Sequence, residues 1–261
     1  FNRCWQGGLS DISLPGFPEH KLCYECTAMK IVILMLSCCA VMSQPFTTRD
    51  IPFMAQGATP LTIRFLTNLS TTVDSTVNAT PAFTPSSNAL IVVNAAIGIT
   101  GGFLTAITNT GTTNLSWLGL STNIAGVMNH TLCISQLPIG TAPFSMTVVF
   151  ASSTTALGAE IHVYEITNAN TSGLWGTNSI VQAKQVGAVT ANPYQLTFTN
   201  SSTSGTVFVV GAGINSSSSL TAIESPWLLS LDTGHTTTSQ RLETFVRTNV
   251  PGGLTGVYLT N

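Results

Sequence analysis

The stretch Phe144-Ser145-Met146-Thr147-Val148-Val149-Phe150 decides the fold class of this chain. Its even-numbered positions are all apolar, and two polar residues, Ser145 and Thr147, lie between them. Successive side chains of a β-strand point to opposite faces of a sheet, whereas a helix repeats about every 3.6 residues. The alternation therefore predicts a strand with one buried face.

Similar runs rich in Val, Ile, Thr, Phe and Leu recur along the chain, separated by clusters of Gly, Pro, Asn or Ser. They predict strands near residues 61–69, 88–99, 103–108, 114–120, 130–137, 144–151, 160–167, 178–189, 194–199, 206–214, 227–231, 237–248 and 254–259. Residues 88–94 and 206–210 are almost continuously apolar, so we expect both faces of those strands to be covered. No segment has a sustained helical pattern. The expected fold is all-β with little helix, a two-sheet antiparallel β-sandwich that is jelly-roll-like.

The composition changes near Met54. Five of the six cysteines and eight of the 18 charged residues lie in residues 1–53. We expect residues 1–53 to be an N-terminal prefix or arm, and residues 54–261 to be a β-sandwich structural module. Three interpretations of the prefix stay open: a secretory signal starting at Met29, sequence upstream of a true start at Met54, or an extended arm that reaches a neighbouring subunit.

Composition and charge restrict the partners. Hydrophobic residues make up 44% of the chain, which argues against disorder, and charged residues only 7%. The formal net charge is -2 and no Lys/Arg cluster occurs, so we expect no nucleic-acid partner, and we also expect no membrane span. So little charge permits dense packing against neighbouring molecules. A homo-oligomer, together with other structural proteins of the same assembly, is the expected partner set.

Cysteine spacing raises the question of a metal. Cys23-x-x-Cys26 has the spacing of a zinc-ligand pair, and Cys4 and His20 precede it. A second close pair is missing, so we predict no metal and no cofactor. Cys133 lies in an apolar run and is interpreted as a buried small hydrophobic residue.

Catalytic constellations are weak in this sequence. Asp232 and His235 lie close together, but a surface turn explains them more simply than a triad does. Glu160, His162 and Tyr164 share one face of a predicted strand, and we expect that face to be solvated. Glu165 lies on the opposite face, so it cannot complete a glycosidase pair with Glu160. We expect it to bind a loop backbone, and we predict no catalytic residues.

Aromatic residues and glycosylation motifs offer candidate carbohydrate sites. Trp175 and Trp227 have loop-like contexts and are candidates for stacking on a sugar, whereas Trp117 is expected in the core. Seven Asn-x-Ser/Thr motifs are glycosylation candidates if the chain enters a secretory route: Asn68, Asn78, Asn114, Asn129, Asn170, Asn200 and Asn215.

A resemblance rests on the order of five segments: 87–93, 115–117, 144–150, 163–166 and 205–210. In that order the chain resembles a jelly-roll-like β-sandwich module that recurs in tailed-phage structural proteins and in bacterial secreted or surface proteins. The resemblance implies a virion structural role in head decoration, a fibre or a tail. The alternative it implies is a secreted bacterial surface or filament-forming protein, extracellular, with a glycan as a further ligand or modification. It brings no catalytic residues.

Overall fold

The computed structural model describes residues 60–125, 128–180, 182–184, 194–198, 206–214, 219–222, 228–235, 240–250, 252–253 and 256–260. The prefix, its boundary at Met54 and the signal at Met29 lie outside these residues. The described elements are strands and one short 3-10 helix, namely β1 Thr62–Ala79, β2 Leu90–Ile97, β3 Leu104–Asn109, β4 Leu118–Ala125, β5 Met128–Gln136, β6 Val148–Thr167, η1 Leu174–Ser179, β7 Tyr194–Thr197, β8 Thr206–Ile214, β9 Thr221–Ala222, β10 Leu228–His235, β11 Gln240–Val250 and β12 Gly256–Thr260.

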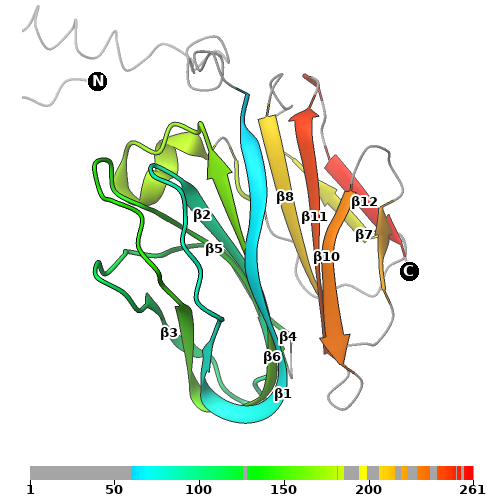
Figure 1. Ribbon diagram of the computed structural model, residues 1–261. Helices are drawn as coiled ribbons and strands as arrows, with labels where there is room; N and C mark the ends of the chain where they lie inside the picture. Colours follow the sequence, from blue (N-terminus) through cyan, green and yellow to red (C-terminus); the bar gives the residue numbers. More distant parts are fainter. Residues whose placement is uncertain are drawn as a thin grey trace, which may run out of the picture. The chain divides into compact units, whose positions relative to one another are not determined.

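The described strands form three antiparallel sheets (Figure 1). The largest has the order β1-β6-β2-β5-β4, with β3 also paired to β6. The second has the order β10-β11-β8, and the third has the order β7-β12-β9. The prediction of an all-β chain with antiparallel sheets and almost no helix is therefore confirmed.

The largest sheet curls along its long strand β6. Phe150, in the first half of β6, and Ile161, in the second half, belong to the same buried cluster. Between them Gly158 has a φ of +110°, a conformation that side chains with a Cβ rarely adopt. A Cβ at this position would also lie 2.7 Å from the Thr71 carbonyl oxygen of β1. Gly158 therefore permits the irregular pairing at this point while β1 and β6 stay in close contact.

The apolar core lies on one face of β2, β5 and β6. Ile91, Val93, Cys133 and Ile161 contribute to it, and all are fully buried. The alternation predicted for residues 144–150 is confirmed, since Met146, Val148 and Phe150 are buried and Ser145 is exposed. Cys133 is a buried core residue as predicted, and burial raises the pKa of its thiol.

The second sheet covers the other face of the largest one. Every residue of β2 is buried, as expected for a strand covered on both sides. Val207 and Val209 of β8 pack with Val92 of β2. Val210, on the opposite face of β8, packs with Leu259 of β12. β8 is therefore apolar on both faces, with one face toward the largest sheet and one toward the third.

Some strand predictions were wrong. Residues 144–151 and 160–167 were expected to form separate strands, but one strand, β6, starts at Val148 and runs without a break to Thr167. Within residues 178–189, the described part contains the end of η1 and no strand. β9 was not predicted. β1 continues ten residues beyond the predicted end at Leu69, because the Thr- and Val-rich segment that follows has high β-propensity without apolar alternation.

Candidate functional site

A buried polar layer lies between the largest sheet and the β10-β11-β8 sheet. Glu160, His162 and Tyr164 project from β6 into this layer, and their exposed fractions are 0%, 0% and 1%. The expectation that this face is solvated was wrong, because the second sheet covers it. Burial also raises the pKa of the Tyr164 hydroxyl. Polar groups removed from water in this way need partners within the protein.

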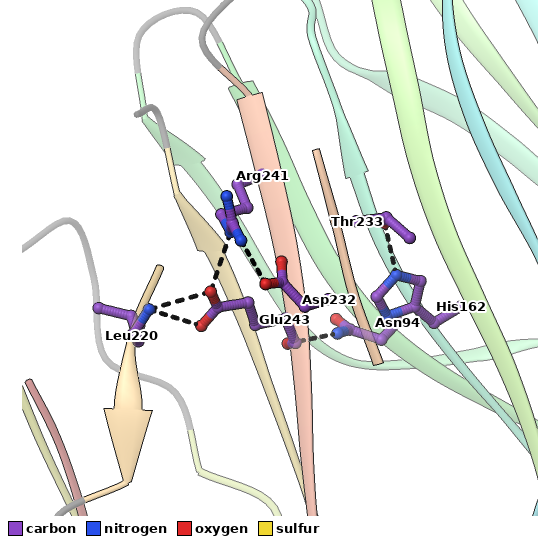
Figure 2. A network of polar contacts seen from close by, with 7 residues as sticks. All are labelled: Asn94, His162, Leu220, Asp232, Thr233, Arg241 and Glu243. Carbon is purple, nitrogen blue, oxygen red and sulfur yellow. Dashed lines mark hydrogen bonds and ion pairs between the residues drawn. The ribbon is translucent and has the colours of Figure 1, made fainter. Parts of the chain in front are cut away.

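Threonines of the second sheet form hydrogen bonds with both ring nitrogens of His162, and Figure 2 shows the one to Thr233. Its Nδ1 lies 2.8 Å from Oγ1 of Thr244 on β11, and its Nε2 lies 2.7 Å from Oγ1 of Thr233 on β10. A neutral imidazole has one donor and one acceptor nitrogen, and each threonine hydroxyl can take either role. Burial lowers the pKa of His162 to about 3, so the ring is neutral near pH 7.

Asn94 joins β2 and β5 of the largest sheet to β11 of the second sheet. Its Nδ2 donates to Oγ1 of Thr244 at 2.8 Å and to the backbone oxygen of Glu243 at 3.2 Å. Its Oδ1 lies 2.8 Å from Nε2 of His130 and can only accept, so His130 donates this bond. Burial lowers the pKa of His130 to about 4. Both the nitrogen and the oxygen of the Asn94 amide therefore form hydrogen bonds.

The backbone of β8 passes directly above Asn94. A Cβ added at Gly211 would lie 2.2 Å from the Asn94 Oδ1. That separation is far below a normal van der Waals contact, so only glycine permits β8 to come this close.

Glu160 is a fully buried carboxylate with partners on two neighbouring strands. Its Oε1 accepts a hydrogen bond from Ser70 Oγ of β1 at 2.8 Å and lies 2.8 Å from Nδ1 of His235 on β10. A carboxylate in this position needs such partners to offset the loss of hydration.

Glu243 forms a second polar cluster, which extends toward β9 and β10 (Figure 2). Both of its carboxylate oxygens accept a hydrogen bond from the Leu220 backbone nitrogen at 2.9 Å. Arg241 Nε donates to Glu243 at 3.0 Å, and Arg241 Nη2 forms an ion pair with Asp232. Burial raises the pKa of Glu243 although its hydrogen-bond donors lower it. The bond to Asp232 is the largest of the effects that raise the pKa of Arg241.

The proposed surface turn at Asp232 and His235 was also wrong. Both residues lie in β10, which pairs with β11 in an antiparallel register. The register places Asp232 beside the Arg241 cluster and His235 beside Glu160. The two residues therefore have different partners, and they do not form the Asp–His pair of a catalytic triad. Among the described residues, no group of three or more His, Cys, Asp or Glu side chains is placed to hold a metal ion.

Glu165 behaves as the sequence predicted. Its Oε2 accepts a hydrogen bond from the Ser86 backbone nitrogen at 2.7 Å, in the connection before β2. Its Oε1 accepts from Ser86 Oγ at 2.9 Å and from Arg64 Nε at 2.8 Å. This carboxylate anchors the connection between β1 and β2.

The candidate carbohydrate residues have different environments. Trp175 is half-buried in η1 with a φ of +60°. Trp117 is half-buried against the apolar core, close to its expected place. Trp227, Asn200 and Asn215 lie outside the described residues.

The described glycosylation motifs differ in exposure. Asn78 and Asn129 are buried in strands, with 4% and 0% exposure, whereas Asn114 is exposed. Asn68 and Asn170 are half-buried, and Asn170 Oδ1 accepts hydrogen bonds from Ser172. A glycan needs an accessible amide, so Asn114 is the best placed of the five.

Sequence reasoning missed Asn94 and Thr244, which connect the two sheets. One signal was present: Asn94 interrupts the apolar run Leu90-Ile91-Val92-Val93, and an amide inside a strand covered on both faces must have a buried partner. Thr244 gave no signal, because threonine is common on exposed strand faces as well.

The comparisons with known proteins give no relative: no family model, no curated protein and no solved structure matches this chain. Among the described residues, no helix has the length and apolar character needed to span a membrane.

Proposed function

We propose that this chain is a virion structural protein of a tailed phage, a head-decoration, fibre or tail component that acts by self-assembly and not as an enzyme. The observation that carries the proposal is the buried polar layer. The groups with catalytic potential, such as His162 and Glu160, are fully buried and bind neighbouring strands. Their hydrogen bonds fix one sheet on another, which suits a rigid building block.

The fold that we propose for the module is a jelly-roll-like β-sandwich. Its support is the covered face of β2, where Val92 packs with Val209 of β8 and Asn94 binds Thr244 of β11. Two antiparallel sheets that face each other across a buried layer are the defining feature of sandwich folds. This proposal agrees with the resemblance of the strand order to phage modules.

Low charge supports the assembly role. Ten charged residues remain after position 53: Arg64, Asp74, Glu160, Glu165, Lys184, Glu224, Asp232, Arg241, Arg247 and Glu243. Several of them, including Glu160 and Glu243, are buried and bonded within the described fold. The surface therefore has few charges with which to repel other copies, and its expected partners are further copies and other proteins of the same particle.

The second candidate is a secreted bacterial surface or filament protein. The exposed motif at Asn114 favours it, since a glycan can attach there without entering the core. Intact-mass measurement and N-terminal sequencing of native material separate the two proposals. A chain that begins at Met54 or Ala55 and carries no glycan supports the virion role. A chain that begins after Ser43, or that carries a glycan, supports secretion.

Negative-stain electron microscopy of the purified full chain tests self-assembly. We expect particles of uniform shape that contain several copies. A field of single small particles at micromolar concentration would contradict both structural roles and would favour a stand-alone binding module.

A further inference from the structure

The long strand β1 forms an edge of the largest sheet. In the part of the chain that the structure describes, β1 pairs with β6 and with no other strand. The other edge of β1 therefore presents backbone donors and acceptors, which can extend the sheet. β1 contains neither lysine nor proline, the residues that commonly block such an edge.

Bulges leave a regular segment in the middle of this edge. The pairing of β1 with β6 is irregular between Phe65 and Thr67 and again between Thr71 and Asp74. From Thr67 to Thr71 it advances one residue at a time. Bulges twist and protect an edge, so the segment Thr67–Thr71 is the part best shaped to accept another strand. Its middle residue is Leu69.

The charges of β1 are placed symmetrically about Leu69. Arg64 precedes Leu69 by five residues and Asp74 follows it by five, and β1 has no other charged residue. Their partners on β6, Glu165 and Leu157, are eight residues apart, and the irregularity at Gly158 lies between them. The Arg64 side chain is 58% exposed.

The neighbouring residues follow the same symmetry. Phe65 and Val73 are each four residues from Leu69, and they are 42% and 67% exposed. Thr67 and Thr71 are each two residues from it. In antiparallel sheets, opposite charges, aromatic with β-branched residues, and Thr with Thr are favourable cross-strand pairs. An antiparallel copy of β1 centred on Leu69 would pair Thr67 with Thr71 inside the regular segment, and it would place the charged and apolar positions opposite one another in the register.

We propose that β1 is a homotypic docking edge, along which two copies of this chain pair their β1 strands antiparallel about a two-fold axis at Leu69. Arg64 of each copy then lies opposite Asp74 of the other in the strand register, and the two largest sheets become one continuous sheet. A two-fold interface uses the same surface on both partners, which this symmetric strand satisfies. The inference deepens the proposed self-assembly and rests on it.

Cysteine cross-linking of the full chain tests the register. In the Thr67→Cys/Thr71→Cys double variant, the new thiol at position 67 of one copy would lie opposite the new thiol at position 71 of the other, within disulfide reach. In either single variant, the equivalent cysteines would be four residues out of register. This is about 14 Å at about 3.4 Å per residue, beyond a disulfide. We expect peptide mapping of the oxidised double variant to identify a 67–71 link between chains, and neither single variant to form a link at its new cysteine.

Charge reversal gives an independent test. Asp74→Arg would place arginine opposite Arg64 of the other copy, and we expect the dissociation constant of the pair to rise at least tenfold. Asp74→Asn should have a smaller effect. Thr105→Arg, on the exposed side of β3, is the control and should leave association unchanged.

The outcomes separate this inference from the proposed function. An assembled protein without the 67–71 link, and insensitive to Asp74→Arg, would overturn the β1 interface while leaving self-assembly standing. That result would also follow if the segment preceding β1 occupied the edge. A glycan at Asn68 in native material would overturn the interface too, since it would block the regular segment. A full chain that stays monomeric would overturn both proposals.

Discussion

His162 makes the stability of the fold depend on pH. Its pKa is lowered to about 3 in the folded protein, whereas an unfolded histidine titrates near 6.5. Below pH 6.5 the unfolded chain therefore binds more protons than the folded one. The free energy of unfolding should fall by about 1.4 kcal/mol per pH unit for each such histidine. His130, whose pKa is lowered to about 4, acts in the same direction.

Urea denaturation at several pH values measures this effect. Stability should be greatest above pH 6.5 and should decrease as the pH falls toward about 4.5. Within this range the raised pKa of Glu243 partly opposes the loss, because the folded form takes up a proton on Glu243 before the unfolded form does, and this contribution stops growing below about pH 4.5. His162→Gln should reduce the slope between pH 6.5 and 4.5. A slope unchanged by that substitution would show that His162 does not control it.

The Thr244 hydroxyl is a second testable contact. Thr244→Val keeps the side-chain shape but removes the oxygen that binds His162 and Asn94. Two buried groups would lose a partner, so we expect a destabilisation of about 1–3 kcal/mol. Chemical denaturation gives the value. Thr105→Val, at an exposed position of β3, is the matched control and should change stability by less than about 0.5 kcal/mol. Equal effects of the two substitutions would argue against the buried layer.

At the scale of elements, Gly211 determines how closely β8 approaches β2. Gly211→Ala would place a methyl group against the Asn94 amide, so we expect a loss of more than about 2 kcal/mol. Asn94→Ala removes the amide that would clash, but it also removes the Asn94 hydrogen bonds and is therefore destabilising by itself. The double variant should therefore be more stable than the sum of the two single effects predicts. Strict additivity in this cycle would contradict the close approach.

Much of the strand content could be predicted from the local sequence pattern. The strand predictions that were wrong depend on contacts between segments far apart in the sequence. The burial pattern of residues 144–150 followed from their alternation, and β2 was predicted from a run that is apolar except for Asn94. The continuity of β6 could not be predicted, because Ser152 to Thr155 resemble a loop in sequence. The pairing of β6 with β1 resumes on either side of them, at Ala151 and Ala156.

The candidate site was predictable only in part. The shared face of Glu160, His162 and Tyr164 followed from strand periodicity, but its burial depends on β10 and β11, about 70 to 80 residues further along the chain. Local sequence contains no information about which sheet covers that face. The prediction of a surface turn at Asp232 and His235 was wrong for the same reason, since the partners of both residues come from other strands.

At the scale of the whole molecule, the described strands form a β unit with little charge and an edge at β1 that pairs with no other described strand. A soluble monomer normally carries charge on about a quarter of its surface positions, and it protects its sheet edges. Here Lys184 is the one lysine after position 53, and β1 has none. The exposed edge is therefore expected to be covered by another copy of the chain.

Sedimentation velocity of the full chain at micromolar concentration tests whether the chain self-assembles. We expect a defined oligomer that persists on dilution toward the low micromolar range. Asp74→Arg should shift that oligomer toward smaller species, while Thr105→Arg should not. A single monomeric boundary across the whole concentration range, with the protein folded and soluble, would contradict the assembly role.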